Sequence, residues 1–477
     1  MAFPLRANRP FFSFMRGLGC CALLSLAGCS FVPAYHTPDV PSASSWRAAD
    51  QPGAAARGGE WWREFHDDAL NALVDRGLRG NYTLAAAVAR VEQARGSAAV
   101  AGAGQYPQVT LDGNYQRQNN YSTTAKRSIS IGATYEVDFW GKQQAIADSA
   151  DELVSASAFD AQTVHMTLAA SITDSYFQVR SLDRRIALAQ RIVADAQQLL
   201  DLVQVQANLG AASDLEVAQQ RNVLETYQGS LPALQEQRDQ ALYQLAVLVG
   251  TTPQGFSLAP AHEAASKVPA PALGLPVDLL AQRPDIQAAE ARLKSVNFDI
   301  GAARAAFLPN VSLNLLGGLD TLGGGSIWSA VGTVSQPLFT GGLLNGQLTV
   351  TKAHAQELLA TYRELWIEAL QDVQTQISAS QQSAKSYSLN TAAVASAREA
   401  SRLAQVRYRL GATDFQTLLI AERTQYQAED ALLQIDLQQL QAAVGLFRAL
   451  GGDFDPSVTK QLASHAPAAP LQTETTR

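Results

Sequence analysis

Side chains suited to catalysis or metal binding are scattered along this chain of 477 residues. The histidines show no pair at the spacing of a zinc site, and no paired carboxylates lie at ligand spacing. A glycine-rich stretch at 317–332 lacks the Gly-Lys-Ser or Gly-Lys-Thr ending of a phosphate-binding loop. We therefore predict that the protein is not an enzyme and holds no metal. The histidines beyond the N-terminal segment 1–28 are His36, His66, His165, His262, His354 and His465.

The cysteines point to a lipid rather than to catalysis. Cys20 and Cys21 fall in an apolar stretch that follows several arginines and is typical of a secretory signal, which we place at residues 1–28. The stretch ends in Leu-Ala-Gly-Cys29, which resembles a bacterial lipobox, so we predict a covalent lipid such as palmitate on Cys29. Ser30, rather than an aspartate, directly follows Cys29. In known lipoproteins this favours export to the outer membrane. An ordinary signal peptide with an incidental cysteine is the alternative.

Composition excludes several classes of partner. The net charge of −7 and the pI near 5.5 argue against binding to nucleic acid. Without a thiol in the mature chain, and with Met166 as its one methionine, a sulfur relay for copper or silver has no support. No stretch after the signal reaches 18 apolar residues, so only strands would take this chain across a membrane.

An internal repeat organises the chain. Residues 81–111 match residues 283–313 at a shift of 202, and "NLGAASDLEVAQQR" from Asn208 matches "RLGATDFQTLLIAER" from Arg409. Each copy is predicted as helix, strand, strand, very long helix and long helix. We place the copies at 66–250 and 277–452, with a lipidated segment at 29–65 and a linker at 251–276. A disordered tail is expected at 453–477.

The longest helices are predicted at about 142–208 and 345–409, and some 65 residues make a rod of roughly 100 Å. Apolar residues recur in each at alternating three- and four-residue steps, which indicates coiled-coil packing. Plain amphipathic packing within one bundle is the alternative. The first seam comprises Leu168, Ile172, Val179, Leu182, Ile186, Ala189, Val193, Ala196, Leu200 and Val203. The weaker second seam comprises Val373, Ile377, Ala384, Tyr387 and Val394.

Each copy also carries a pair of alternating strands. Apolar and polar residues alternate at 108–115, 128–139 and 311–315, with a polar loop from Gln116 to Arg127. A fourth strand near 327–337 rests mainly on the repeat. Half-buried strands of a soluble sandwich would alternate too. In a membrane, however, a sheet of four strands has two open edges, and lipid offers no hydrogen-bond partners for their backbone N–H and C=O groups. Several copies of the chain would therefore have to share one barrel.

Several longer motifs carry a family resemblance. They are "EWWREFHDDALNALV" from Glu60, "LLAQRPDIQAAEARL" from Leu279, "FLPNVSL" from Phe307, "QPLFTGG" from Gln336 and "RYRLGATDFQTLLIAERTQYQAED" from Arg407. With the lipobox, they resemble the TolC-type outer-membrane efflux proteins over about residues 29–452. The resemblance is to the lipoprotein branch that serves resistance-nodulation-division pumps.

The resemblance implies an α+β membrane protein. It implies a homotrimer in which three chains form a twelve-strand barrel continued by a twelve-helix periplasmic barrel, with a small equatorial domain that includes the linker. The strands would lie at 107–118, 126–139, 309–320 and 326–338. A protein of this kind is anchored in the outer membrane, extends into the periplasm and meets an adaptor and an inner-membrane pump. It would be the exit duct for passive export of drugs or other small toxic compounds, and so contribute to antibiotic resistance.

The sequence does not show which compounds are exported. A structural coiled-coil lipoprotein of the envelope and a type I secretion outlet are the alternative functions.

In relatives, charged and aromatic residues at the periplasmic helix turns hold the duct closed. The turns here are expected around Gly210 and Gly411. Ile420 replaces an acid that relatives often carry, which puts an acidic ring at that level in doubt. Solvated helix-end charges, with Asp214 and Asp414 capping helices, are the alternative. The candidate gate residues are Arg407, Tyr408, Arg409, Asp214, Glu216 and Asp414.

Two further motifs are interpreted as structural. Trp61 and Trp62 are expected to form a core pair, although an anchor at an interface is the alternative. Arg283-Pro284-Asp285 suits the start of a helix, because proline loses no hydrogen bond in the first turn and an acid there meets the helix dipole.

Overall fold

The computed structural model describes residues 31–40, 46, 60–120, 122–259, 268–269, 280–320 and 325–452. The predicted signal peptide, Cys29 and the tail at 453–477 lie outside these residues, as does part of the linker. The described chain falls into two compact units. Of the described residues, those within 31–39, 91–157 and 288–362 form one unit, and those within 46–90, 158–287 and 363–452 form the other, together with residue 40.

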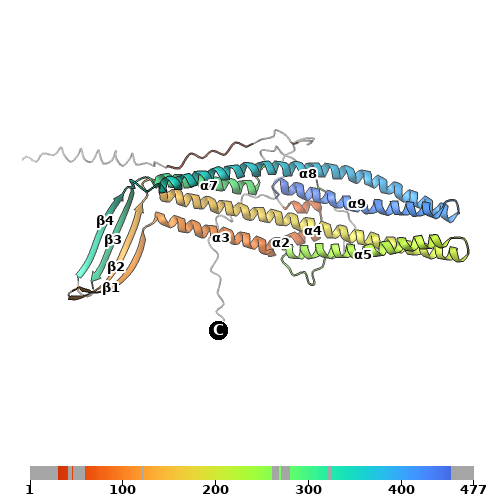
Figure 1. Ribbon diagram of the computed structural model, residues 1–477, viewed down its shortest axis with the longest axis horizontal. Helices are drawn as coiled ribbons and strands as arrows, with labels where there is room; N and C mark the ends of the chain where they lie inside the picture. Colours follow the sequence, from red (N-terminus) through yellow and green to blue (C-terminus); the bar gives the residue numbers. More distant parts are fainter. Residues whose placement is uncertain are drawn as a thin grey trace, which may run out of the picture. The chain divides into compact units, whose positions relative to one another are not determined.

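The first unit contains one antiparallel sheet in the order β1-β2-β3-β4 (Figure 1). Its strands are β1 (Gln108–Asn120), β2 (Ser122–Val137), β3 (Asn310–Asp320) and β4 (Gly325–Ser335). The predicted loop from Gln116 to Arg127 is wrong, because β1 and β2 remain paired up to Asn120 and Ser122. Backbone hydrogen bonds sustain a hairpin ladder without an alternating side-chain pattern. β4 ends at Ser335, short of the prediction, and Pro337 beyond it has no N–H to donate.

The register places most apolar residues of the four strands on one face of the sheet, whereas Leu316, Ile327 and Val331 lie on the other. Leu111 lies opposite Ile131, Ala133 opposite Leu315, and Val311 opposite Val334. Leu111 and Val334 are 73 % and 70 % exposed, so this apolar face is open in the isolated chain. The polar face carries Thr110, Asp112, Asn114, Ser130, Thr134, Asn314 and Thr333.

The N-terminal segment 31–40 is docked on α7 (Pro284–Ala305) within the same unit. The Asn297 side chain donates a hydrogen bond of 2.8 Å to the Pro33 carbonyl. A Cβ at Gly301 would lie 2.4 Å from Cγ2 of Val32, so this close approach requires glycine.

The second unit is helical. Its two long helices, α4 (Lys142–Asn208) and α8 (Leu343–Arg409), are each 67 residues long and continue into the first unit. They are followed by α5 (Asp214–Leu248) and α9 (Phe415–Ala449), each of 35 residues. One constant shift along the sequence therefore carries the α4–α5 hairpin onto the α8–α9 hairpin. The shorter elements of this unit are η1 (Trp61–Phe65) and α2 (Asp68–Gly80). The helix α3 (Tyr82–Gly102) lies mostly in the first unit, which also contains η2 (Ala103–Gln105).

Trp61 and Trp62 are core residues, as expected. Both are buried, and Trp61 stacks on Phe447 of α9 with ring centroids 5.2 Å apart. Phe65 meets Phe177 of α4 at 5.0 Å. Aromatic side chains bury the largest apolar areas, so this short 3-10 helix contributes much of the core that joins α4 to α9.

The seam predicted in α4 is largely buried, with Ile172, Val179 and Val203 fully enclosed. The seam in α8 needs one correction. Ala384 is exposed and Ser383 is buried instead, with its hydroxyl bonded to the Ser380 carbonyl at 3.0 Å. A straight helix has 3.6 residues per turn, so a strict 3.5-residue pattern drifts off the buried face.

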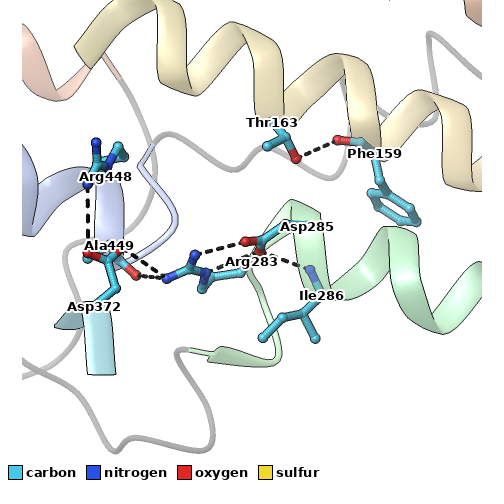
Figure 2. Close-up of polar contacts among 8 residues, drawn as sticks. All are labelled: Phe159, Thr163, Arg283, Asp285, Ile286, Asp372, Arg448 and Ala449. Carbon is cyan, nitrogen blue, oxygen red and sulfur yellow. Dashed lines mark hydrogen bonds and ion pairs between the residues drawn. The ribbon is translucent and has the colours of Figure 1, made fainter. Parts of the chain in front are cut away.

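Arg283 fixes the start of α7 (Figure 2). Its guanidinium donates to the Ala449 carbonyl at the end of α9 (2.9 Å) and to both oxygens of Asp285 (3.1 and 2.8 Å). Asp372 of α8 lies 3.7 Å from Arg283 and 3.7 Å from Arg448. Arg283 is buried, so the motif has a structural role: it holds the start of α7 against the end of α9. This agrees with the prediction from the helix-start pattern.

Candidate functional site at the helix tips

Both hairpins turn through the same backbone motif. In the first tip, the Ala211 and Gly210 N–H groups donate to the carbonyls of Gln206 and Ala207 at 2.8 and 2.9 Å. In the second tip, Ala412 and Gly411 donate to Arg407 and Tyr408 at the same two distances. This is the Schellman arrangement, which needs a left-handed residue at the turn. Gly210 and Gly411 supply it, with φ of +77° and +69°.

The acidic residues of the tips cap helices. Ser213, rather than Asp214, is the N-cap of α5, and it forms a reciprocal capping box with Glu216. The alternative in which Asp214 caps that helix is therefore wrong. Asp414 does cap α9, accepting hydrogen bonds from the backbone and hydroxyl of Thr417 at 2.7 and 3.1 Å. These bonds lower the pKa of the Asp414 carboxyl.

Tyr408 links the two tips. Its hydroxyl donates to Oε1 of Gln206 at 3.2 Å, and its ring lies 5.5 Å from that of Phe415. The ring packs against a small apolar cluster that joins α4, α8 and α9 through Val203, Ala404, Phe415 and Leu418. Burial and the nearby charge of Glu216 raise the pKa of Tyr408. The hydroxyl therefore stays protonated and available as a donor.

The arginines do not pair with the predicted acids. Arg407 donates to the Ala412 carbonyl of its own turn at 3.3 Å, and Arg409 is exposed. Among the described residues, no ion pair joins either arginine to Asp214, Glu216 or Asp414. The structure thus brings Tyr408 together with Gln206 and leaves the charged candidates at separate helix ends.

Above the tips, an ion-pair cluster joins α9 to α4 and α8. Arg185 binds Asp430 through two hydrogen bonds of 2.7 and 3.1 Å, and Arg184 lies 2.5 Å from Asp436. Glu429 is buried and accepts from Arg191 and, at 2.6 Å, from Arg398. The sequence analysis missed these residues.

A signal for them did exist in the sequence. Glu422, Glu429 and Asp436 follow the buried Phe415 of α9 at steps of seven residues, where a helical seam is expected to carry apolar side chains.

Ile420 lies beside the tip in an apolar groove between α5 and α9, with a volume of about 930 Å³. Leu419, Val223, Tyr227 and Tyr426 also line it. An isoleucine at this position contributes apolar surface and no charge.

Neither metal chemistry nor a helical membrane crossing is indicated by the described part of the chain. Within it, no three His, Cys, Asp or Glu side chains gather as a metal site. None of its helices has an apolar stretch long enough to span a membrane.

Comparison with known proteins identifies the family. The family model described as "Outer membrane efflux protein" matches residues 73–251 and 275–452, which correspond to the two repeats. The chain belongs to this family. The pyoverdine export outer membrane protein OpmQ of Pseudomonas putida is 35 % identical over 456 residues, covering 90 % of this chain and 96 % of that protein. The outer membrane protein OprJ of Pseudomonas aeruginosa is 30 % identical over 453 residues, covering 91 % and 94 %.

Solved structures agree with this membership. The outer-membrane channel OprN matches with a TM-score of 0.82 and 29 % identity, covering 89 % of this chain and 99 % of that one. The open state of the MtrE channel of Neisseria gonorrhoeae matches at 0.79 and 27 %, with the same coverage. The predictions of a TolC-type efflux protein and of an exit duct in the outer membrane are confirmed.

Proposed function

We propose that three copies of this efflux protein close a twelve-strand barrel in the outer membrane, and that their long helices form a twelve-helix tube in the periplasm. The continuous apolar face of the β-sheet supports this proposal, because lipid is the environment that such an exposed face suits. β1 and β4 pair on one side only within the chain. An unpaired strand edge is costly in lipid, so each edge needs a neighbour.

The repeat predicts how those edges pair. It carries Val109 of β1 onto Val311 of β3, and Ala133 of β2 onto Val334 of β4. Within the chain, Gly132 of β2 lies opposite Leu316 of β3. The same correspondence places Thr333 of β4 opposite Asn114 of β1 in the next copy. This register keeps Leu111, Leu315 and Val334 on the same side of the sheet in every copy.

Paired cysteines test the barrel. Oxidation of a Thr333→Cys, Asn114→Cys double variant should give covalent dimers and trimers on a non-reducing gel. Thr333→Cys with Asp112→Cys, which moves the second cysteine to the next position on the same face of β1, should not. If only this shifted pair cross-links, the register is wrong and the shared barrel stands. A protein that stays monomeric in native mass spectrometry with no cross-link would contradict the trimer itself.

We propose further that Cys29 carries the lipid. Phe31, close behind it in the sequence, lies with its ring centroid 6.5 Å from that of Trp140, and Trp140 is bonded through its indole N–H to the Pro309 carbonyl just before β3. The docked segment 31–40 would thus hold an acyl chain near the base of the sheet. Cys29→Ser should abolish labelling by radioactive palmitate while the barrel still inserts.

Export would be passive here and driven by partners. Names of relatives refer to efflux pumps for toluene, solvents and antibiotics, and to pyoverdine export. We propose a periplasmic adaptor and an inner-membrane resistance-nodulation-division pump as partners, with small toxic compounds as cargo. Deleting the gene together with that of its pump should leave the same drug sensitivity as deleting either one.

We propose that the tips close the tube, with Tyr408 as the main contact. It joins the two hairpins of one chain through Gln206, and its ring covers Phe415. Arg407, Arg409, Asp214, Glu216 and Asp414 would set the charge at the tube's end.

A further inference from the structure

The apolar face of the β-sheet carries two arginines. In the described strands, the register places only two charged residues on the face that contains Leu111, and these are Arg117 of β1 and Arg127 of β2. Both are exposed. Acidic residues of these strands, such as Asp112 and Asp320, belong to the opposite, polar face. The apolar face is therefore positively charged at one end and neutral elsewhere.

The arginines lie toward the end of the sheet that is remote from the helices (Figure 1). β2 leaves the hairpin at Ser122, and α4 follows soon after its last residue, Val137. From Val137 back to Arg127 the strand covers about 34 Å. At a tilt of about 40° this corresponds to a height of about 26 Å, and the apolar band of outer-membrane barrels is about 25 Å tall. In the proposed barrel, on which this inference rests, Arg127 therefore lies where the hydrocarbon of the outer leaflet meets its headgroups.

The two arginines are close enough to share one anion. Arg127 lies opposite Tyr115, and Arg117 is opposite Ala125, so the arginines are diagonal neighbours on one face. Long side chains reach each other across such a diagonal. Two cations at this separation repel each other unless an anion lies between them. A charge on the lipid face costs most at the bilayer midplane and little near the headgroups, so an anionic headgroup is the partner available at this level.

Tyr115 holds Arg127 along the face. The guanidinium carbon of Arg127 lies over the Tyr115 ring, 5.3 Å from its centroid. A cation–π contact of this kind restricts the side chain before any ligand arrives, which lowers the entropic cost of binding. The N–H groups of a guanidinium form a planar fork that matches two oxygens of a phosphate. Phosphate is therefore the anion that these side chains suit best.

The boundary between copies adds an aromatic ring to the same place. In the register proposed for the barrel, Thr333 lies opposite Asn114 of the next copy. Three positions further along, Ala330 lies opposite Arg117. Trp328 of the neighbouring copy is then a diagonal neighbour of Arg117, within reach of a long side chain. Trp328 is 81 % exposed in the isolated chain and lies on the apolar face.

We propose that Arg117 and Arg127 bind the phosphate of an anionic lipid in the outer leaflet at each boundary between copies, with Trp328 of the neighbouring copy beside Arg117. The lipid is a phosphorylated, multiply acylated glycolipid of the lipid A type. Its acyl chains lie against the apolar rows of the sheet, which include Leu111 and Ile129. A free phosphate ion would contact the arginines alone and gain nothing from the apolar face.

Binding of lipid A to the purified trimer tests the proposal. Arg117→Gln with Arg127→Gln removes both charges, and the affinity for bis-phosphorylated lipid A in native mass spectrometry should fall roughly tenfold. Lys126→Gln is the matched control, because Lys126 pairs with Gln116 at a position of the polar face. It should stay within about twofold of the parent. Trp328→Leu keeps an apolar side chain and should weaken binding by roughly threefold.

The parent trimer gives a second test that does not depend on how the variants fold. Lipid A without its phosphates should bind roughly tenfold more weakly than the intact lipid, and millimolar inorganic phosphate should not displace the intact lipid. Equal binding of the two lipids would overturn the proposal, as would displacement by inorganic phosphate. So would a trimeric double glutamine variant that binds like the parent, or an equal loss in Lys126→Gln.

Two further outcomes separate the levels of the proposal. An unchanged affinity in Trp328→Leu would overturn the placement of the lipid at the boundary between copies. A parent that is not trimeric in native mass spectrometry would refute the proposed barrel, whereas a trimer that does not distinguish the two lipids would refute the lipid site alone.

Discussion

The two helical hairpins, α4–α5 and α8–α9, have the same backbone geometry but differ in the side chains that form contacts between them. Both turn through a Schellman motif at a glycine, and their helices have equal lengths. Yet Ala207 in the first tip corresponds to Tyr408 in the second, and Gln228 in the first corresponds to the buried Glu429. The duplicated unit thus accounts for the shared backbone of the two hairpins, and the different side chains of the second hairpin supply the contacts that join it to the first.

The largest expected effect concerns Asp174 of α4, which corresponds to Thr375 of α8. Burial raises the pKa of Asp174 to about 7, although Arg448 lowers it in part, and its Oδ1 has no hydrogen-bond partner. The folded chain holds this proton where the unfolded chain has lost it, so stability falls as pH rises from 4 through 7. A shift of about three units corresponds to about 4 kcal/mol.

Asp174→Asn should remove most of that pH dependence. Thermal melts of the parent and the variant at pH 5 and pH 8 are the measurement, with the variant gaining most at pH 8. Equal melting temperatures for the two proteins at both values would contradict the buried proton.

The next effect concerns Glu429. Glu429→Gln leaves Arg191 and Arg398 facing a neutral amide, and because both arginines are more than half exposed we expect a loss of about 2 kcal/mol rather than the full penalty of a buried pair. Chemical denaturation measures it. Gln228→Glu, at the corresponding exposed site of the first hairpin, is the control and should change stability little.

The smallest effects are at the caps. Ser213→Ala should cost about 1 kcal/mol over a wide pH range, because a hydroxyl accepts the backbone hydrogen bond without ionising. Asp414→Ala should lower the melting temperature near neutral pH. Since the folded pKa of Asp414 is lowered, its contribution is present above the unfolded pKa near 3.8 and disappears as pH falls through the folded value. A pH-independent difference would contradict the charged cap.

Sequence patterns predicted what depends on local periodicity. The α4 helix begins at Lys142 and ends at Asn208, and the positions of Gly210 and Gly411 in the two turns follow from the repeat. The pair of strands was predicted, but its continuation to Asn120 and Ser122 was not, because ladder hydrogen bonds need no side-chain pattern. Glu429 was missed as well, since its importance comes from arginines 238 and 31 positions away, on two other helices.

Single-channel conductance of Tyr408→Ala tests most directly whether the second tip closes the duct. The change makes position 408 equal to its counterpart Ala207 and removes the hydrogen bond to Gln206 and the contact with Phe415. Tyr387→Ala, a half-buried tyrosine elsewhere on α8, is the control. We expect the mean conductance of purified trimers in planar bilayers to rise roughly fivefold for Tyr408→Ala and to stay at the parent value for Tyr387→Ala. A Tyr408→Ala channel that conducts like the parent would contradict a closed tip held by this residue.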